Sequence, residues 1–177
     1  MKKNPIYLWI LLVLSALSSL LGLFGVLTPV QSADSVAISA MGRSDAEATY
    51  LKELVTYTVR TSEHGHSLFN VLLVLVSAVL VVLGIVFLVK RKIQLANYTY
   101  LAYALLAIIG TLYSFIGAQD AAVVFTDELY RTSTVVGVRI FSVISVVVNL
   151  LFIALVLYKN WRQQKELAEE VEAEEVA

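Results

Sequence analysis

The sequence contains no cysteine, and its four longest apolar runs contain no Asp, Glu, Lys, Arg or His. The absence of cysteine excludes disulfides, thiolate catalysis and every cysteine-based metal or redox site. Ionisable side chains inside membrane helices usually mark proton relays, ion pathways or catalytic groups. Their absence from these runs argues against transport coupled to a membrane carboxylate and against proteolysis by a pair of carboxylates.

Charged residues are also scarce, at 15% of the 177 residues, whereas hydrophobic residues make up 59%. Soluble domains average about 25% charged residues and about 45–50% apolar ones. The apolar residues are concentrated in the runs 6–27, 68–89, 99–117 and 140–158. A helix needs about 20 apolar residues to cross a bilayer. The sequence therefore predicts an all-α integral membrane protein, with a four-transmembrane-helix bundle in residues 1–158 and an acidic tail at 159–177.

The positive charges predict the orientation of the chain. Residues 1–5, 90–98 and 159–177 carry eight Lys and Arg residues, whereas the loops 28–67 and 118–139 carry five. Lysine and arginine close to the ends of spans favour the cytoplasmic side. We therefore expect both termini in the cytoplasm and both of these longer loops outside.

The first run allows an alternative interpretation. Lys2 and Lys3 precede it, and residues 30–32 before Ala33 resemble the small-residue cleavage site of a secretory signal. The run has 22 residues, whereas the apolar region of a signal has about 7–15. The length favours a retained helix, and the sequence leaves open whether residues 1–32 are retained or cleaved.

Small and polar residues recur on one face of each run. The residues involved are Ser15, Ser18, Gly22 and Gly25 in the first run, Asn70, Ser77 and Gly84 in the second, Ala107, Gly110, Ser114 and Gly117 in the third, and Ser142, Ser145 and Asn149 in the fourth. Spacings of three and four residues place side chains on one helix face. Small faces let membrane helices approach closely, and Asn amides form hydrogen bonds between them. We predict that these residues mediate helix packing.

The two outer loops carry related motifs at residues 50–54 and 125–129. Ser44 followed by Glu47 forms a capping box, which predicts the start of an amphipathic helix. Residues 121–129 have a similar apolar spacing, so we predict a second outer helix there. The bundle would then be a duplicated helical hairpin with an extracellular amphipathic helix in each copy. The candidate partner-docking residues on these helices are Tyr50, Leu51, Leu54, Phe125 and Leu129.

Two further features bear on chemistry. His64 and His66 flank Gly65 just before the second run. Two imidazoles with Glu63 are too few ligands for a convincing metal site, so we interpret this segment as a solvated turn, with a metal or pH-sensing role as the alternative. The tail at 159–177 carries six glutamates. Such runs are usually solvated, and docking onto a basic partner is the alternative. No catalytic, cofactor or metal site is predicted.

Residues 4–16, with the sequence NPIYLWILLVLSA, resemble the start of short four-span membrane proteins of Gram-positive bacteria, some of which are labelled ABC-transporter permeases. The resemblance covers this segment and the four-span plan. It implies a bacterial plasma membrane and a transporter partner.

We expect a non-enzymatic accessory or scaffold subunit of a larger transporter or cell-envelope complex. Such a subunit contacts the lipid bilayer and other membrane proteins or its own copies, without a cofactor or nucleic acid. The alternative is an oligomeric, permease-like transporter or pore around the polar faces of the second and fourth spans.

Overall fold

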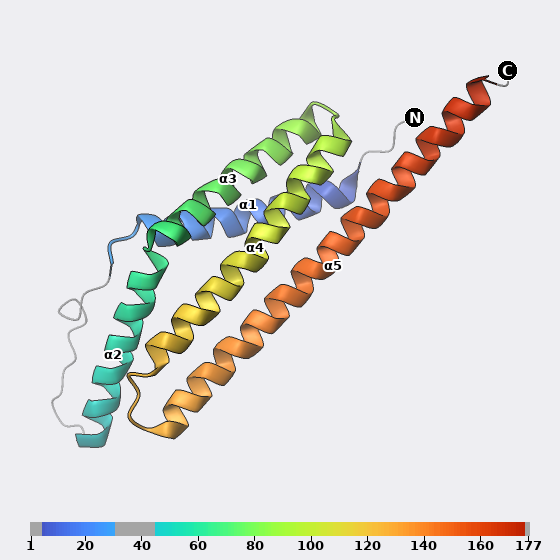
Figure 1. Ribbon diagram of the computed structural model, residues 1–177. Coiled ribbons are helices and arrows are strands. Elements are labelled where there is room, and N and C mark those ends of the chain that lie inside the picture. The colour runs from blue at the N-terminus through green and yellow to red at the C-terminus, as the bar shows by residue number, and fades with distance from the viewer. Residues whose placement is uncertain (1–4, 31–44, 176–177) are drawn as a thin grey trace.

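The computed structural model describes residues 5–30 and 45–175, and these ranges form five helices without a strand (Figure 1). The helices are α1 (Ile6–Leu27), α2 (Asp45–Gly65), α3 (Leu68–Val89), α4 (Ile93–Ala122) and α5 (Glu128–Glu175). Four of them, α1, α3, α4 and α5, are long and apolar enough to cross a membrane. Ser44 of the predicted capping box lies outside the described residues. The predicted cleavage site at 30–33 also lies outside them, except for Val30.

The bounds of α1 and α3 coincide with the first two apolar runs. Helices α4 and α5 extend beyond the predicted spans at both ends, because no proline interrupts their flanking residues. The predicted second outer helix is wrong: residues 121 and 122 end α4, residues 123–127 form a turn, and Leu129 lies in the first turn of α5. The duplicated unit of span, outer helix and span is therefore not reproduced, since α2 has no counterpart in the described chain.

Helix α3 passes into α4 through the short turn at residues 90–92. The amide of Lys92 donates to the carbonyl of Phe87 at 2.9 Å, and the amide of Arg91 donates to that of Leu88 at 3.0 Å. This is the Schellman pattern, in which glycine usually occupies the left-handed position. Here Arg91 occupies it, with φ of 57°.

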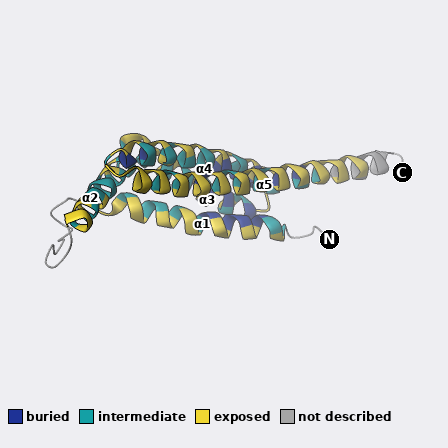
Figure 2. Ribbon diagram, turned by 90° about the horizontal axis from the view of Figure 1, so that it is seen from below, coloured by how far each residue is buried: buried dark blue, intermediate teal, exposed yellow. Residues whose placement is uncertain are grey.

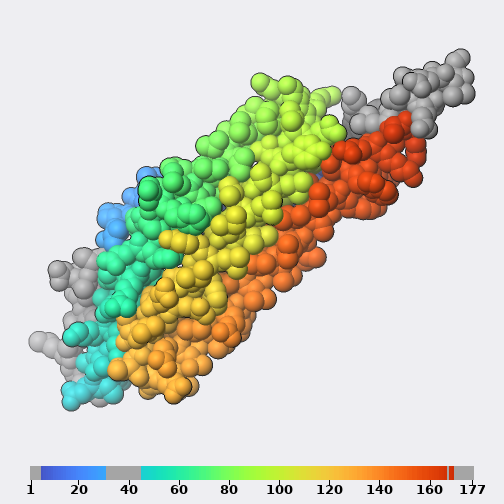
Figure 3. All heavy atoms as spheres, in the orientation of Figure 1, coloured from blue at the N-terminus to red at the C-terminus, as the bar shows by residue number. Residues whose placement is uncertain are grey.

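Helix α1 packs on α3, α3 packs on α4, and α4 packs on α5, while α2 packs mainly on α4. Figure 3 shows α3 (green), α4 (yellow) and α5 (orange) side by side on one face. We call the end where α1 begins and α3 turns into α4 the tail end, because residues 159–175 of α5 extend there (Figure 1). The opposite end, where α2 lies, is the α2 end.

The hydrophobic core lies in the half of the bundle nearer the tail end. Its buried members are Leu8, Leu11, Leu12, Val81, Leu88, Ala96, Tyr100, Tyr103, Ala104 and Val156. Figure 2 shows the buried residues of α1 gathered in its N-terminal half, whereas the remainder of that helix is mostly exposed. The two halves of the bundle are thus packed differently.

Candidate functional site

A cavity of about 970 Å³ occupies the half of the bundle nearer the α2 end. Its walls come from α1, α3, α4 and α5, and residues of α2 border it at the end of the bundle. Helix α1 packs mainly on α3 and α5 packs on α4, so the space between α1 and α5 is left to this cavity.

Most of the predicted small and polar residues line this cavity. They are Ser18, Gly22, Gly25, Asn70, Ser77, Ala107, Gly110, Ser114, Gly117 and Ser142. An added Cβ on Gly25 or on Gly110 would meet no atom within 4 Å. Within the described chain these two glycines therefore face open space and not a neighbouring helix, and packing against a partner at these positions stays a prediction.

The remaining predicted packing residues lie elsewhere. Ser15, Ser145 and Asn149 border a smaller cavity of about 250 Å³ next to the first. Gly84 does mediate close packing, since its added Cβ would lie 2.8 Å from Cδ2 of Leu12 on α1.

The two asparagine amides do not reach across the bundle as predicted. Asn70 donates from Nδ2 to the carbonyl of Gly65 at 2.7 Å, and Asn149 donates to that of Ser145 in its own helix at 2.9 Å. Instead, Oγ1 of Thr111 on α4 lies 3.2 Å from Oγ of Ser145 on α5. Spacing identified the polar face of each helix but not the partner of each side chain.

His64 is half-buried rather than solvated. Its ring stacks on Tyr113 of α4 with 4.1 Å between centroids, and its Nε2 lies 3.1 Å from the Tyr113 carbonyl. The ring also covers Gly117, where an added Cβ would overlap the imidazole. The hydroxyl of Tyr113 in turn lies 2.7 Å from Oγ of Ser67, which caps α3. The predicted solvated turn is wrong here, because His64 fixes α2 onto α4.

His66 connects the last residues of α1 to α2. Its Nδ1 lies 2.7 Å from the carbonyl of Ser62, and its Nε2 lies 2.7 Å from the carbonyl of Thr28. Both partners only accept hydrogen bonds, and only the imidazolium form donates from both ring nitrogens. These two carbonyls accordingly raise the pKa of His66 above 6.5.

The same geometry bears on the metal alternative for this segment. Both ring nitrogens of His66 are engaged with carbonyls. Within residues 5–30 and 45–175, no three His, Asp or Glu side chains come together as a metal site. The pH-sensing alternative stays a prediction, and the two carbonyl contacts that raise the pKa of His66 support it.

The predicted docking residues divide into two groups. Phe125 is buried, with its ring 6.2 Å from that of Tyr50 and 5.5 Å from that of Tyr57. Tyr50 also packs on Tyr130, at 4.3 Å. Tyr50 and Phe125 therefore hold α2 against the turn at 123–127 and are not free to dock a partner. Leu51 is half-buried. Leu54 and Leu129 remain exposed, at 37% and 73%.

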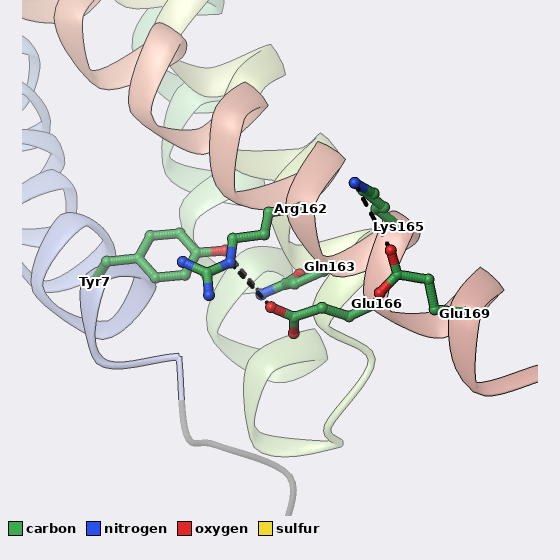
Figure 4. Close-up of polar contacts among 6 residues, drawn as sticks. All are labelled: Tyr7, Arg162, Gln163, Lys165, Glu166 and Glu169. Carbon is green, nitrogen blue, oxygen red and sulfur yellow. Dashed lines mark hydrogen bonds and ion pairs between the residues drawn. The ribbon is translucent and has the colours of Figure 1, made fainter. Parts of the chain in front are cut away.

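A polar network at the tail end was missed from the sequence. The hydroxyl of Tyr7 donates to Oδ1 of Asn97 at 3.0 Å, and Nδ2 of Asn97 lies 3.3 Å from Oδ1 of Asn160 and 3.5 Å from Oε1 of Gln163. Gln163 donates back to the Tyr7 hydroxyl at 3.5 Å, and Figure 4 shows these two side chains facing each other. Asn97 is fully buried. The network joins α1, α4 and α5.

The signal for this network was weak but present. Asn160 and Gln163 are spaced three residues apart on one face of a helix, immediately after an apolar run. Their partners Tyr7 and Asn97 lie near the starts of two other spans, which the predicted topology places at the same membrane surface. In the sequence, these four residues stand at the ends of the apolar runs or in the segments next to them, and nothing there marks them as partners.

Comparison with known proteins identifies a family. Comparisons with curated proteins and with solved structures gave no match. A family model described as a domain of unknown function, DUF8777, matches residues 1–169, which include the cavity, the His66 link and the tail-end network. The chain therefore belongs to the DUF8777 family.

Proposed function

We propose that this chain is a non-enzymatic accessory or scaffold subunit of a larger complex in a bacterial plasma membrane. The tail end would face the cytoplasm, because Lys90, Arg91 and Lys92 lie directly at a helix end there. The α2 end would lie outside. Many large apolar side chains of the four long helices are exposed in the isolated chain, which is the surface that lipid or a neighbouring membrane protein covers.

The observation that carries this proposal is the extension of α5 beyond the bundle (Figure 1). After the network at Gln163 the helix continues to Glu175. Its described ion pairs are Arg162 with Glu166 at 2.9 Å and Lys165 with Glu169 at 3.7 Å, all with side chains more than half exposed (Figure 4). Exposed pairs of this kind contribute about 0.3–0.5 kcal/mol each, and helices of about 12 residues are marginal in water. A partner surface would stabilise this segment.

Copurification tests this proposal. The tagged chain, extracted in mild detergent, should retain a reproducible membrane-protein partner, and a variant ending at Lys165 should lose it while unfolding at the same temperature. Glu166→Gln is the matched control, because it removes one ion pair and keeps the segment. Full retention of every partner by the shortened variant would overturn the role of the tail.

The exposed leucines at the α2 end provide a second test. Leu54→Glu and Leu129→Glu place charges on side chains that are exposed, so the protein should stay folded. Loss of a partner in these variants would assign docking to this end. Unfolding instead would show that both residues support the bundle.

The alternative of a transporter or pore draws on the polar side chains of the cavity, among them Asn70, Ser77 and Ser142. Within one described chain this cavity meets the packed core around Leu8 and Tyr100, so a continuous path would require several copies. Solute flux through the purified protein in liposomes, without a partner, would favour this alternative and overturn the accessory role.

A further inference from the structure

We propose that the 970 Å³ cavity binds the hydrocarbon chains of one membrane phospholipid, with its phosphate headgroup at the rim formed by Thr28, His66 and Asn70. These three residues border the cavity at the α2 end. This binding site goes beyond the accessory role and does not depend on it.

The dimensions of the cavity favour a lipid over a partner helix. On α1 the lining runs from Ser18 to Thr28, which is about 15 Å at 1.5 Å per residue. A volume of about 970 Å³ then gives a mean cross-section of about 65 Å², whereas a helix about 10–12 Å wide covers about 80–110 Å². Extended hydrocarbon chains are much thinner. A helix would enter only if the walls moved apart.

The walls are held in place at the tail end of the bundle. The network of Tyr7, Asn97 and Gln163 ties α1 to α4 and α5. Gly84 brings α3 close to Leu12 of α1. The network opposes the separation of α1 from α5 that a helix would need, and the contact at Gly84 holds α1 on α3. The cavity nearer the α2 end is left free for a thinner occupant.

The order of polarity along the cavity matches that of a lipid. Its depth is lined by apolar side chains such as Leu73, Val74 and Leu106 together with small hydroxyls such as Ser77 and Ser114, whereas the imidazoles and the amide that line it lie at the α2 end. The rim is polar, with Thr61, Ser62 and the two histidines in addition to Thr28 and Asn70. Pockets of about 300–1,000 Å³ with apolar walls and a few polar groups are typical ligand sites. The gap between α1 and α5 provides a route from the bilayer.

The charge of the rim favours a phosphate. No Asp, Glu, Lys or Arg is among the residues that line the cavity, and its imidazoles belong to His64 and His66. The two carbonyl acceptors at its ring nitrogens favour the cationic form of His66. A cation at the mouth of an otherwise uncharged cavity attracts an anionic headgroup.

Native mass spectrometry of the full chain in a non-ionic detergent tests the site. The probe is phosphatidylglycerol with two 16-carbon chains. Wild type should retain one lipid, and Gly110→Leu should weaken binding at least tenfold because the leucine side chain projects into the space that the hydrocarbon chains need. Gly25→Leu, which also points into open space, is the second filling variant if the first does not fold.

Gly137→Leu is the matched control. Gly137 is a helical glycine whose added Cβ also meets no atom within 4 Å, but it does not line the cavity. It should bind the lipid like wild type. Equal binding by the filled variants, or no retained lipid in wild type, would overturn the proposal.

Diacylglycerol with the same chains separates the headgroup from the hydrocarbon. Wild type should bind phosphatidylglycerol several-fold more tightly than diacylglycerol, and His66→Gln should reduce this preference. Equal affinities in wild type would overturn the assignment of the rim.

If Gly110→Leu loses a protein partner while its lipid binding is unchanged, the cavity holds a protein helix and the lipid proposal is wrong. Loss of partners in the shortened tail variant alone would leave lipid binding intact, so the two proposals fail separately.

Discussion

The tail half and the α2 half of this bundle use similar residues in different ways. Near the tail end, Gly84 lets Leu12 pack tightly into a filled core, and Asn97 bonds across three helices. Near the α2 end, Gly110 faces open space and Asn70 bonds to the nearby carbonyl of Gly65. The same residue type thus packs helices in one half and borders a cavity in the other, so residue type alone does not determine its role.

The largest expected difference between the halves is between two glycine substitutions. Gly84→Leu should destabilise the protein by about 3 kcal/mol, because the new side chain overlaps Leu12 within a filled core. Gly110→Leu should change the free energy of unfolding by less than about 0.5 kcal/mol, since its side chain enters empty space. Thermal unfolding of both variants in detergent measures the difference. Equal destabilisation would contradict the contrast between the halves.

The asparagines give a second, smaller contrast. Asn97→Leu should destabilise by about 2 kcal/mol, because it leaves the buried polar partners of the network without their central amide. Asn149→Leu is the control and should have an effect of about 0.5 kcal/mol, since it removes one bond within a helix. Chemical denaturation in detergent would compare the two. A larger effect at Asn149 would contradict the assignment of the interhelical hydrogen bonds to Asn97.

The link at His66 predicts a pH dependence confined to the α2 end. The pKa of His66 is raised above 6.5 in the folded chain, so its stabilisation is fully present below pH about 6.5 and is lost as the pH rises through the raised value. The Tm should fall over this range, by less than Asn97→Leu lowers it. In His66→Gln this step should disappear. A step that persists in the variant would assign it to another group.

The smallest effect is expected at the turn of the tail end. Arg91→Gly should stabilise the protein by about 0.5–1 kcal/mol, because Arg91 has a φ of 57°, a conformation that glycine adopts without steric strain. Lys90→Gly is the matched control, since Lys90 has a φ of −75° and should gain nothing. Equal effects in the two variants would show that the lost positive charge, not the backbone, is responsible.

The sequence predicted those features of the fold that neighbouring residues determine, and it missed those that depend on contacts between distant residues. The bounds of α1 and α3 were predictable because their apolar runs end at prolines, polar residues or charges. The length of α5 was underestimated because a change from apolar to polar residues ends a membrane span but does not end a helix. The second outer helix was wrong for the same reason.

The candidate site was predicted only in part. Spacing placed Gly22, Gly25 and Gly110 on shared helix faces, but it carries no information on whether the opposite side holds a helix or a void. The bonds of Asn97 to residues 90 positions earlier and 63 positions later leave no periodic pattern. His64 and His66 were interpreted as solvated because Tyr113 and Thr28, which their rings contact, lie far from them in the sequence.

The tail-end network also has a consequence for the order in which the protein is made. Tyr7 is synthesised 156 residues before its partner Gln163. Until the ribosome has completed α5, α1 lacks part of its polar anchor and Asn97 lacks two of its acceptors. Helix α1, which is made before the other described helices, is therefore among the last of them to be fixed. A nascent chain interrupted before Asn160 would expose an incompletely bonded amide, a feature by which quality control could distinguish it from the finished protein.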